Sequence, residues 1–258
     1  MVERPPHYGN RITVDQQEGG GSRAVIYPGN GVAVSVLVVA ALFVLTQLYA
    51  AIPLLGPVGI SMGADATFAL STCFSVTYAV GFLIWGPVSD RYGRKKVMTA
   101  SIGVLAVATL LCSGASSLPI LAGLRALQGA AASGFAPVAL AYLTEAVAPR
   151  WRARAIGAMS AAFLVAGIFG QVLASIIALR ASWSWFFVAC GVVLAMIFTI
   201  ILFSVVEVPN HTPSMTLLQQ FGNLVGLLFR PAIVLLGIAH ITLLLSFVAL
   251  YTGIGPVS

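Results

Sequence analysis

Seven long stretches of apolar side chains run through this chain, and the short segments between them hold almost all of its charge. A helix that crosses about 30 Å of hydrocarbon needs about 20 apolar residues, so each stretch is long enough to span a membrane. The predicted spans are 32–53, 67–88, 97–114, 119–143, 154–178, 184–206 and 231–252. The pattern therefore predicts an all-α integral membrane protein.

The composition supports this fold class. Charged side chains make up 8% of the residues, whereas soluble domains have about 25%, and so little charge cannot cover a surface that faces water. The net charge of +6 does not indicate nucleic acid, because the basic residues lie between apolar stretches rather than on one face of a soluble fold. We expect the lipid bilayer as the surroundings and no nucleic acid as a partner.

The sequence has no pattern typical of a metal site, a cofactor site or an enzyme. Cys73, Cys112 and Cys190 are far apart and lack metal-ligand spacing, so we interpret them as small core residues. No Ser-His-Asp grouping, HExxH motif or phosphate-binding glycine loop is present. We expect no metal, no cofactor and no enzymatic activity.

The basic residues predict the orientation of the helices. Eleven of the 13 Lys and Arg residues fall in segments that alternate onto one side of the membrane: Arg4, Arg11, Arg23, Arg91, Arg94, Lys95, Lys96, Arg150, Arg152, Arg154 and Arg230. Arg180 lies on the opposite side, and Arg125 lies inside the fourth stretch. Loops rich in Lys and Arg remain in the cytoplasm. We therefore expect a multi-pass protein of the inner or plasma membrane with a cytoplasmic amino terminus.

The chain divides into four predicted parts. Residues 1–30 contain scattered charge and no apolar core, which is typical of a disordered tail, here cytoplasmic. Residues 31–206 form a six-helix bundle, and residues 207–230 form a cytoplasmic linker. Residues 231–258 contain a seventh transmembrane helix, after which the sequence stops.

The segment GPVSDRYGRKK, residues 86–96, concentrates charge between the second and third stretches. Topology explains its four basic residues but not Asp90, Gly86 or Gly93, since acidic residues contribute little to topology. A residue as small as Gly86 allows another helix to approach closely, and Gly93 suits a turn with positive φ. Asp90 beside several basic side chains predicts ion pairs at the membrane boundary, where the dielectric constant is lower.

This segment, read as Gly-x-x-x-Asp-Arg-x-Gly-Arg-Lys-Lys, resembles the loop signature of the major facilitator superfamily. RALQG, residues 125–129, and LTEAVAPRWRARAIG, residues 143–157, are similar to the family's fourth helix and to its junction with the fifth. The resemblance covers roughly residues 31–252. It implies the amino-terminal six-helix bundle, built as a 3+3 inverted repeat, plus a seventh helix. We expect a chain truncated relative to twelve helices, with the second six-helix bundle missing.

The resemblance also implies a cytoplasmic gating motif. Its residues would be Gly86, Asp90, Arg91, Gly93, Arg94, Lys95 and Glu145. Gly86 would be the close-packing glycine and Asp90 the central carboxylate, with basic partners from Arg91, Arg94 and Lys95. Glu145 would lie near the loop and join the charges of Asp90 and Arg94.

Arg125 is the strongest candidate for a binding residue. A charge inside a membrane helix is costly unless it faces protein or water, so such a residue is usually functional. Arg125 and Gln128 share one helical face, and the resemblance places this helix and the first one beside a central cavity. Arg125, Gln128, Gln47 and Tyr49 are therefore our candidates for contact with a substrate or coupling ion. The alternatives remain open: Arg125 reaches from the outer helix end to the interface, and Gln47 and Tyr49 bond between helices.

The fifth predicted helix carries a stripe of mostly small residues that we interpret as a packing seam: Ser160, Gly167, Gly170, Gln171 and Ala174. Drug antiporters of the family have a Gly-Pro-x-x-Gly-Gly run here, which this chain lacks. The first helix and this Gly-Gln step look closer to arabinose-efflux-like bacterial permeases. This departure weakens the case for multidrug antiport of that type.

The expected function is secondary active transport of a small organic solute by rocker-switch alternating access. We expect efflux, with protons as a candidate coupling ion, although no Asp or Glu lies in the core of an apolar stretch. One alternative is a non-transporting half-transporter remnant or membrane partner subunit. Another is a seven-helix receptor or retinal protein, which the cytoplasmic amino terminus and the absence of a lysine in the seventh stretch disfavour.

Overall fold

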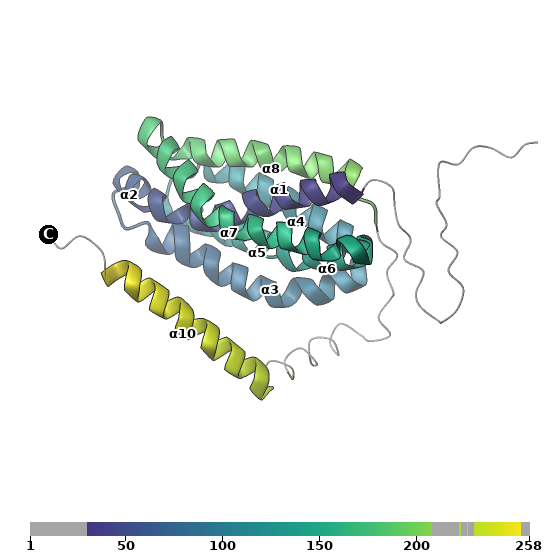
Figure 1. Ribbon diagram of the computed structural model, residues 1–258. Helices are drawn as coiled ribbons and strands as arrows, with labels where there is room; N and C mark the ends of the chain where they lie inside the picture. Colours follow the sequence, from purple (N-terminus) through teal and green to yellow (C-terminus); the bar gives the residue numbers. More distant parts are fainter. Residues whose placement is uncertain (1–29, 208–221, 223–225, 227–229, 254–258) are drawn as a thin grey trace, which may run out of the picture. The chain divides into compact units, whose positions relative to one another are not determined.

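The computed structural model describes residues 30–207, 222, 226 and 230–253, and no strand occurs among them (Figure 1). The predicted tail, residues 1–30, and the predicted linker, residues 207–230, lie almost entirely outside the described residues. Two compact units divide the chain at His211 and Thr212. In the second unit the described helix is α10 (Pro231–Gly253), which coincides with the seventh predicted span.

The described residues of the first unit form nine helical elements, of which eight are α-helices. They are α1 (Asn30–Tyr49), α2 (Ala51–Met62), the π-helix η1 (Phe68–Thr72), α3 (Cys73–Tyr92), α4 (Arg94–Cys112), α5 (Leu118–Ala132), α6 (Ala136–Ala146), α7 (Pro149–Arg180) and α8 (Ser184–Ser204). Six helical segments among the described residues are long and apolar enough to cross a membrane: 31–49, 68–92, 94–112, 118–146, 149–180 and 184–204. The first six predicted spans are confirmed as helices.

The first span extends farther than the sequence predicts. We expect an end near Pro53, but α2 continues through Pro53 and Pro57 as far as Met62. The chain interrupts its helix at Ala50, so Pro53 falls in the first turn of a new helix, where a missing N–H costs little. Gly63, with φ +69°, then ends α2.

The fourth span is also interrupted. Its two parts, α5 and α6, are separated by residues 133–135, where Gly134 and Phe135 donate to carbonyls three residues earlier at 3.1 Å. Such bonds tighten the chain locally. The interruptions in the first and fourth spans fall in the first helix of each three-helix repeat.

The packing of the spans follows the symmetry of an inverted repeat. The most closely packed pairs are α1 with α7, α3 with α5, and α4 with α8, which are the first and fifth, second and fourth, and third and sixth spans. Exchanging the two repeats turns the first pair into the second and returns the third pair to itself. Each span of one repeat therefore packs against a span of the other.

Small residues allow these pairs to approach closely. Gly129 of α5 lies against the Phe74 carbonyl of α3, so that an added Cβ would overlap it. In the seam between α7 and α1, a Cβ at Gly170 would lie 3.1 Å from Thr46 Cα. The predicted α7 stripe is thus a packing seam at Gly170 and Ala174, both buried, but Ser160 is exposed and does not belong to it.

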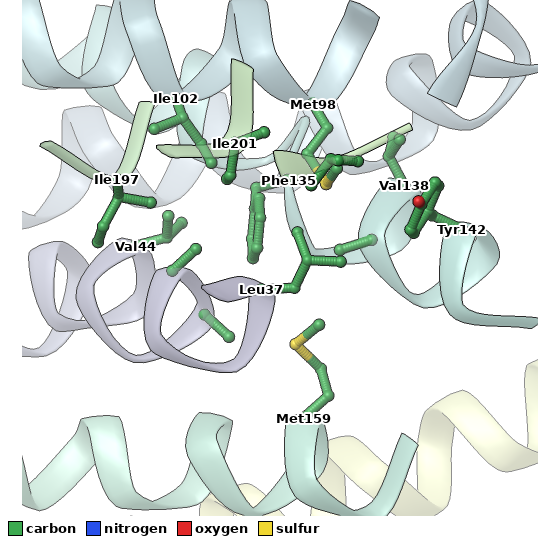
Figure 2. Packing of buried hydrophobic residues seen from close by; sticks show 14 of the residues in the cluster. Leu37, Val44, Met98, Ile102, Phe135, Val138, Tyr142, Met159, Ile197 and Ile201 are labelled. Atoms are coloured by element: carbon green, nitrogen blue, oxygen red, sulfur yellow. The ribbon is translucent and has the colours of Figure 1, made fainter. Parts of the chain in front are cut away.

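Apolar side chains fill the space between the spans. Figure 2 shows the Phe135 ring among Leu37 and Val44 of α1 and Ile201 of α8, within one buried cluster. Met159 of α7 belongs to the same cluster, and Leu37, Val44, Phe135, Met159 and Ile201 have no exposed surface. This core holds the spans of the first unit together.

Candidate functional site

A single residue joins the second and third spans. Gly93 has φ +106° and is buried between the end of α3 at Tyr92 and the start of α4 at Arg94. Only glycine adopts such a backbone conformation readily, as the sequence predicts. The sharp turn brings the two helix ends together, and Arg94 Nη1 reaches Asp90 Oδ1 at 2.5 Å.

Arg94 is the centre of the charged residues, which we call the loop cluster: Ser89, Asp90, Arg94 and Glu145. Its Nη2 donates to Glu145 Oε1 at 2.9 Å, and its Nε lies 3.3 Å from the same oxygen. Its Nη1 also donates to Ser89 Oγ at 2.7 Å. The rigid, planar fork of arginine allows these contacts to form at once.

The loop cluster connects three helix ends through a partly dehydrated cation. The Arg94 side chain is 15% exposed, whereas those of Asp90 and Glu145 are 42% and 40% exposed. A lower local dielectric constant strengthens ion pairs. The ion pairs are therefore strongest on the side of the cluster that faces the bundle, where Arg94 is partly buried. The structure therefore places Glu145, at the end of α6, beside Asp90 and Arg94, at the α3–α4 turn.

Three other residues of the predicted motif lie elsewhere. A Cβ at Gly86 would have no neighbour within 4 Å among the described residues, so Gly86 is not a close-packing glycine in this unit; Gly81, against Ser133, has that position in α3. Arg91 is exposed and forms no ion pair with a described residue. Lys95 Nζ donates to the Leu202 carbonyl at 2.9 Å rather than to a carboxylate. Among the described residues, only Arg94 forms ion pairs with Asp90 and Glu145, so the roles predicted for Arg91 and Lys95 stay predictions.

Arg125 lies inside the bundle, with 1% of its surface exposed. The alternative of a side chain that reaches the interface is therefore wrong. Its Nε donates to the Leu70 carbonyl at 2.8 Å, and its Nη2 donates to the Gln47 carbonyl at 2.9 Å. The guanidinium carbon also lies 4.4 Å from the centroid of the Phe74 ring, a cation–π contact.

The two carbonyls that bind Arg125 are available because their helices are irregular there. Leu70 lies in the π-helix η1, and π-helical turns loosen the regular bond pattern. Gln47 lies in the last turn of α1, where carbonyls lose their helical donors. Arg125 thus joins the first, second and fourth spans at their irregular points.

Gln128 extends this group, which we call the Arg125 network: Arg125, Gln128, Thr109 and Cys112. Gln128 Oε1 accepts from Arg125 Nη1 at 2.9 Å, and Gln128 Nε2 donates to Thr109 Oγ1 at 2.7 Å. Cys112 Sγ lies 3.4 Å from Gln128 Oε1. Thr109 is not among the residues predicted from the sequence, although a threonine within an apolar stretch is a visible signal.

The remaining two candidates differ in exposure. The Gln47 side chain is fully buried and donates weakly to the Phe43 carbonyl at 3.4 Å. Tyr49 is partly exposed, and its ring lies 3.8 Å from a Cβ placed on Gly167. Of the four predicted contact residues, three lie inside the bundle and only Tyr49 reaches its surface.

Carboxylates are rare in these spans. Among the six spans of the described chain, the acidic residues are Asp90 and Glu145, and both lie in the last turn of a helix. Arg125 therefore has no acidic partner in the described residues, and carbonyl, amide and aromatic groups surround its charge. The described residues also contain no group of three or more His, Cys, Asp or Glu side chains that could hold a metal ion.

Comparisons with known proteins agree on one family. The family model described as Major Facilitator Superfamily matches residues 35–257. The chain is 30% identical over 191 residues to an uncharacterized transporter of Buchnera aphidicola subsp. Schizaphis graminum, covering 74% of this chain and 46% of that one. It is 32% identical over 116 residues to the multidrug export protein EmrB of Haemophilus influenzae, covering 45% of this chain and 23% of that one.

The fold is similar to that of solved transporters. A bacterial homologue of the human lysosomal transporter Spinster, in an inward-facing and unoccupied conformation, matches with a TM-score of 0.61 and 19% identity, over 74% of this chain and 45% of that one. This likeness concerns the fold. The chain spans about half the length of the Buchnera transporter and of the Spinster homologue.

Proposed function

The chain belongs to the Major Facilitator Superfamily, and we propose that it acts in secondary active efflux of a small organic solute across the inner or plasma membrane. The observation that carries the proposal is the bridge from Arg94 to both Asp90 and Glu145. It joins the α3–α4 turn to the end of α6, at the side of the bundle that we predict to be cytoplasmic from its basic loops. Such a corner can move as one body during rocker-switch alternating access.

We propose that the loop cluster is the cytoplasmic gate of this cycle. Its bonds hold the helix ends in one arrangement, and the cycle requires a second arrangement in which another surface competes for the same charges. Gly86, which has open space beside it among the described residues, is the place where that surface would approach. A second six-helix bundle is the proposed partner.

We propose different roles for the four candidate contact residues. Tyr49 is the one that is partly exposed, so it would contact the solute directly. Arg125, Gln128 and Gln47 are buried, and they would hold the first, second and fourth spans in the shape that presents Tyr49. Protons are the proposed coupling ion.

Efflux is supported by the likeness to EmrB, whose name describes multidrug export. The experiment measures ethidium accumulation in bacterial cells that make the chain, compared with cells that make the Arg94→Ala variant at equal membrane levels. We expect lower accumulation with the wild-type chain, and a protonophore should abolish the difference. Equal accumulation in the two cultures would contradict ethidium efflux by this chain. It would leave the non-transporting partner subunit as the better description.

A further inference from the structure

The amino terminus of α4 has no capping side chain of its own. The residue before α4 is Gly93, and the first amides of a helix need acceptors that an N-cap side chain usually supplies. The acceptor comes from a distant part of the chain: Glu207 Oε1 accepts from the Lys95 backbone amide at 3.2 Å. A carboxylate is also the charge that the positive end of a helix favours.

Gly93 and Glu207 fit together sterically. A Cβ on Gly93 would lie 2.6 Å from Glu207 Oε1 and 3.1 Å from its Cδ. A larger side chain at position 93 would therefore have to displace the carboxylate. The positive φ of Gly93 is the main reason for glycine here, and the position of Glu207 adds a second, weaker one.

The contact is reciprocal. Lys95, whose amide binds Glu207, sends its ammonium to the Leu202 carbonyl at 2.9 Å. Leu202 lies in the last turn of α8, which ends at Ser204. Carbonyls at a helix end lack donors, and a cation there is favourable. The start of α4 and the end of α8 therefore cap each other through Lys95 and Glu207.

The residue before Glu207 is also held. Tyr142 of α6 donates its hydroxyl to the Val206 carbonyl at 3.0 Å. The segment that follows α8 is thus bound to α4 and to α6, the same two helices that Arg94 joins by way of Glu145. Neither Tyr142 nor Glu207 belongs to the predicted gating motif.

We infer that Glu207 is a positioning residue that fixes the start of the connection after α8 onto the α3–α4 turn, by capping α4 in place of the side chain that Gly93 lacks. Movement of the turn then carries this connection with it. The consequence for transport rests on the proposed gating function, whereas the cap itself does not.

The test uses the full chain in detergent micelles and two measurements that need no transported solute. Hydrogen exchange of the peptide containing Lys95 should become about fivefold faster in Glu207→Ala, as expected for loss of a helix cap. The control Asp65→Ala removes a different carboxylate, one that accepts from the Thr67 amide at 2.8 Å, and should leave that peptide unchanged.

The second measurement is a double-mutant cycle in thermal unfolding. Gly93→Ala should lower the unfolding temperature by both backbone strain and overlap with the carboxylate. Adding Glu207→Ala removes the overlap, so the double variant should unfold at a higher temperature than the two single shifts predict together. Additive shifts, or unchanged exchange at Lys95 in Glu207→Ala, would overturn the inference.

The two proposals fail in different ways. If the exchange and the cycle behave as expected but no variant changes ethidium accumulation, the cap stands and the proposed efflux fails. If efflux depends on Arg94 but the hydrogen-exchange rate at Lys95 does not change in Glu207→Ala, the efflux proposal stands and the inference about Glu207 fails.

Discussion

Arg94 and Glu145 are 51 positions apart in the sequence, and their side chains meet at 2.9 Å between Nη2 and Oε1. Arg94 lies at the first residue of α4, and Glu145 lies next to the last residue of α6. The pair therefore fixes the start of the third span to the end of the fourth span, and through Asp90 it fixes the end of the second span as well.

Replacing Arg94 should impair transport more than replacing its neighbour Arg91. Arg94→Ala removes contacts to two carboxylates worth about 0.5–1 kcal/mol each at a partly exposed site, so ethidium efflux should fall by about tenfold. Arg91→Ala removes an equal charge from the same loop, but Arg91 is exposed and has no ion pair among the described residues. Equal losses in the two variants would show that the loop contributes only its charge.

Two glycines of α5 should respond oppositely to the same substitution. Gly129→Ala places a methyl group against the Phe74 carbonyl, and such overpacking should lower the free energy of unfolding by about 1–3 kcal/mol. Gly123→Ala places it in open space on the same helix and should stabilise α5 by about 0.5–1 kcal/mol. Thermal unfolding in detergent measures both, and a stable Gly129→Ala variant would contradict the packing of α3 on α5.

Arg125→Lys keeps the charge but should destabilise the bundle. A lysine cannot reach the Leu70 carbonyl, the Gln47 carbonyl and the Gln128 amide together in the fork geometry of arginine. Each buried acceptor left unpaired costs about 1–3 kcal/mol. The matched control is Arg180→Lys at the exposed end of α7, which should unfold at the wild-type temperature. An unaltered unfolding temperature for Arg125→Lys would show that the network contributes charge alone.

Cysteine labelling should reveal the orientation of the bundle. Cells making Asp65→Cys, in the segment between α2 and η1, should react with a membrane-impermeant maleimide added outside. Cells making Lys96→Cys, near the α3–α4 turn, should react only after the membrane is permeabilised, because basic loops remain in the cytoplasm. The wild-type chain is the control for labelling of the native cysteines, of which Cys112 and Cys190 are buried and Cys73 is partly exposed. The reverse labelling pattern would contradict a cytoplasmic amino terminus.

The sequence predicts the spans well because a bilayer imposes a simple length and composition on them. It misses the interruptions, since they depend on tertiary partners. Residues 133–135 read as part of an apolar run, yet the carbonyl of Ala130, just before them, accepts from Trp85 Nε1 at 2.8 Å. Pro53 reads as a stop, yet the break at Ala50 allows a second helix to begin.

The candidate sites also contain some features that the sequence predicts and others that depend on tertiary contacts. Asp90, Arg94 and Glu145 could be grouped from a family resemblance, because charged side chains at the ends of spans are confined to the membrane boundary. The burial of Arg125 could not be derived, because it depends on carbonyls freed in two other spans. Glu207 gives only a weak signal, a single acidic residue after an apolar stretch. Its partner is the Lys95 backbone amide, and a backbone amide cannot be recognised as a partner from the sequence.

The placement of Arg125 also determines how the bundle would respond to membrane voltage. An elementary charge moved across the whole membrane field gains about 2.3 kcal/mol per 100 mV. If rocking displaces α5 by about 3 Å along the normal of a layer about 30 Å thick, the buried guanidinium contributes only about 0.2 kcal/mol per 100 mV. With Arg125 buried and no acidic residue deep in the described spans, the bundle would move very little charge across the membrane if it rocks as we propose. Any steep dependence of transport on membrane potential would then report the charge of the solute or coupling ion itself.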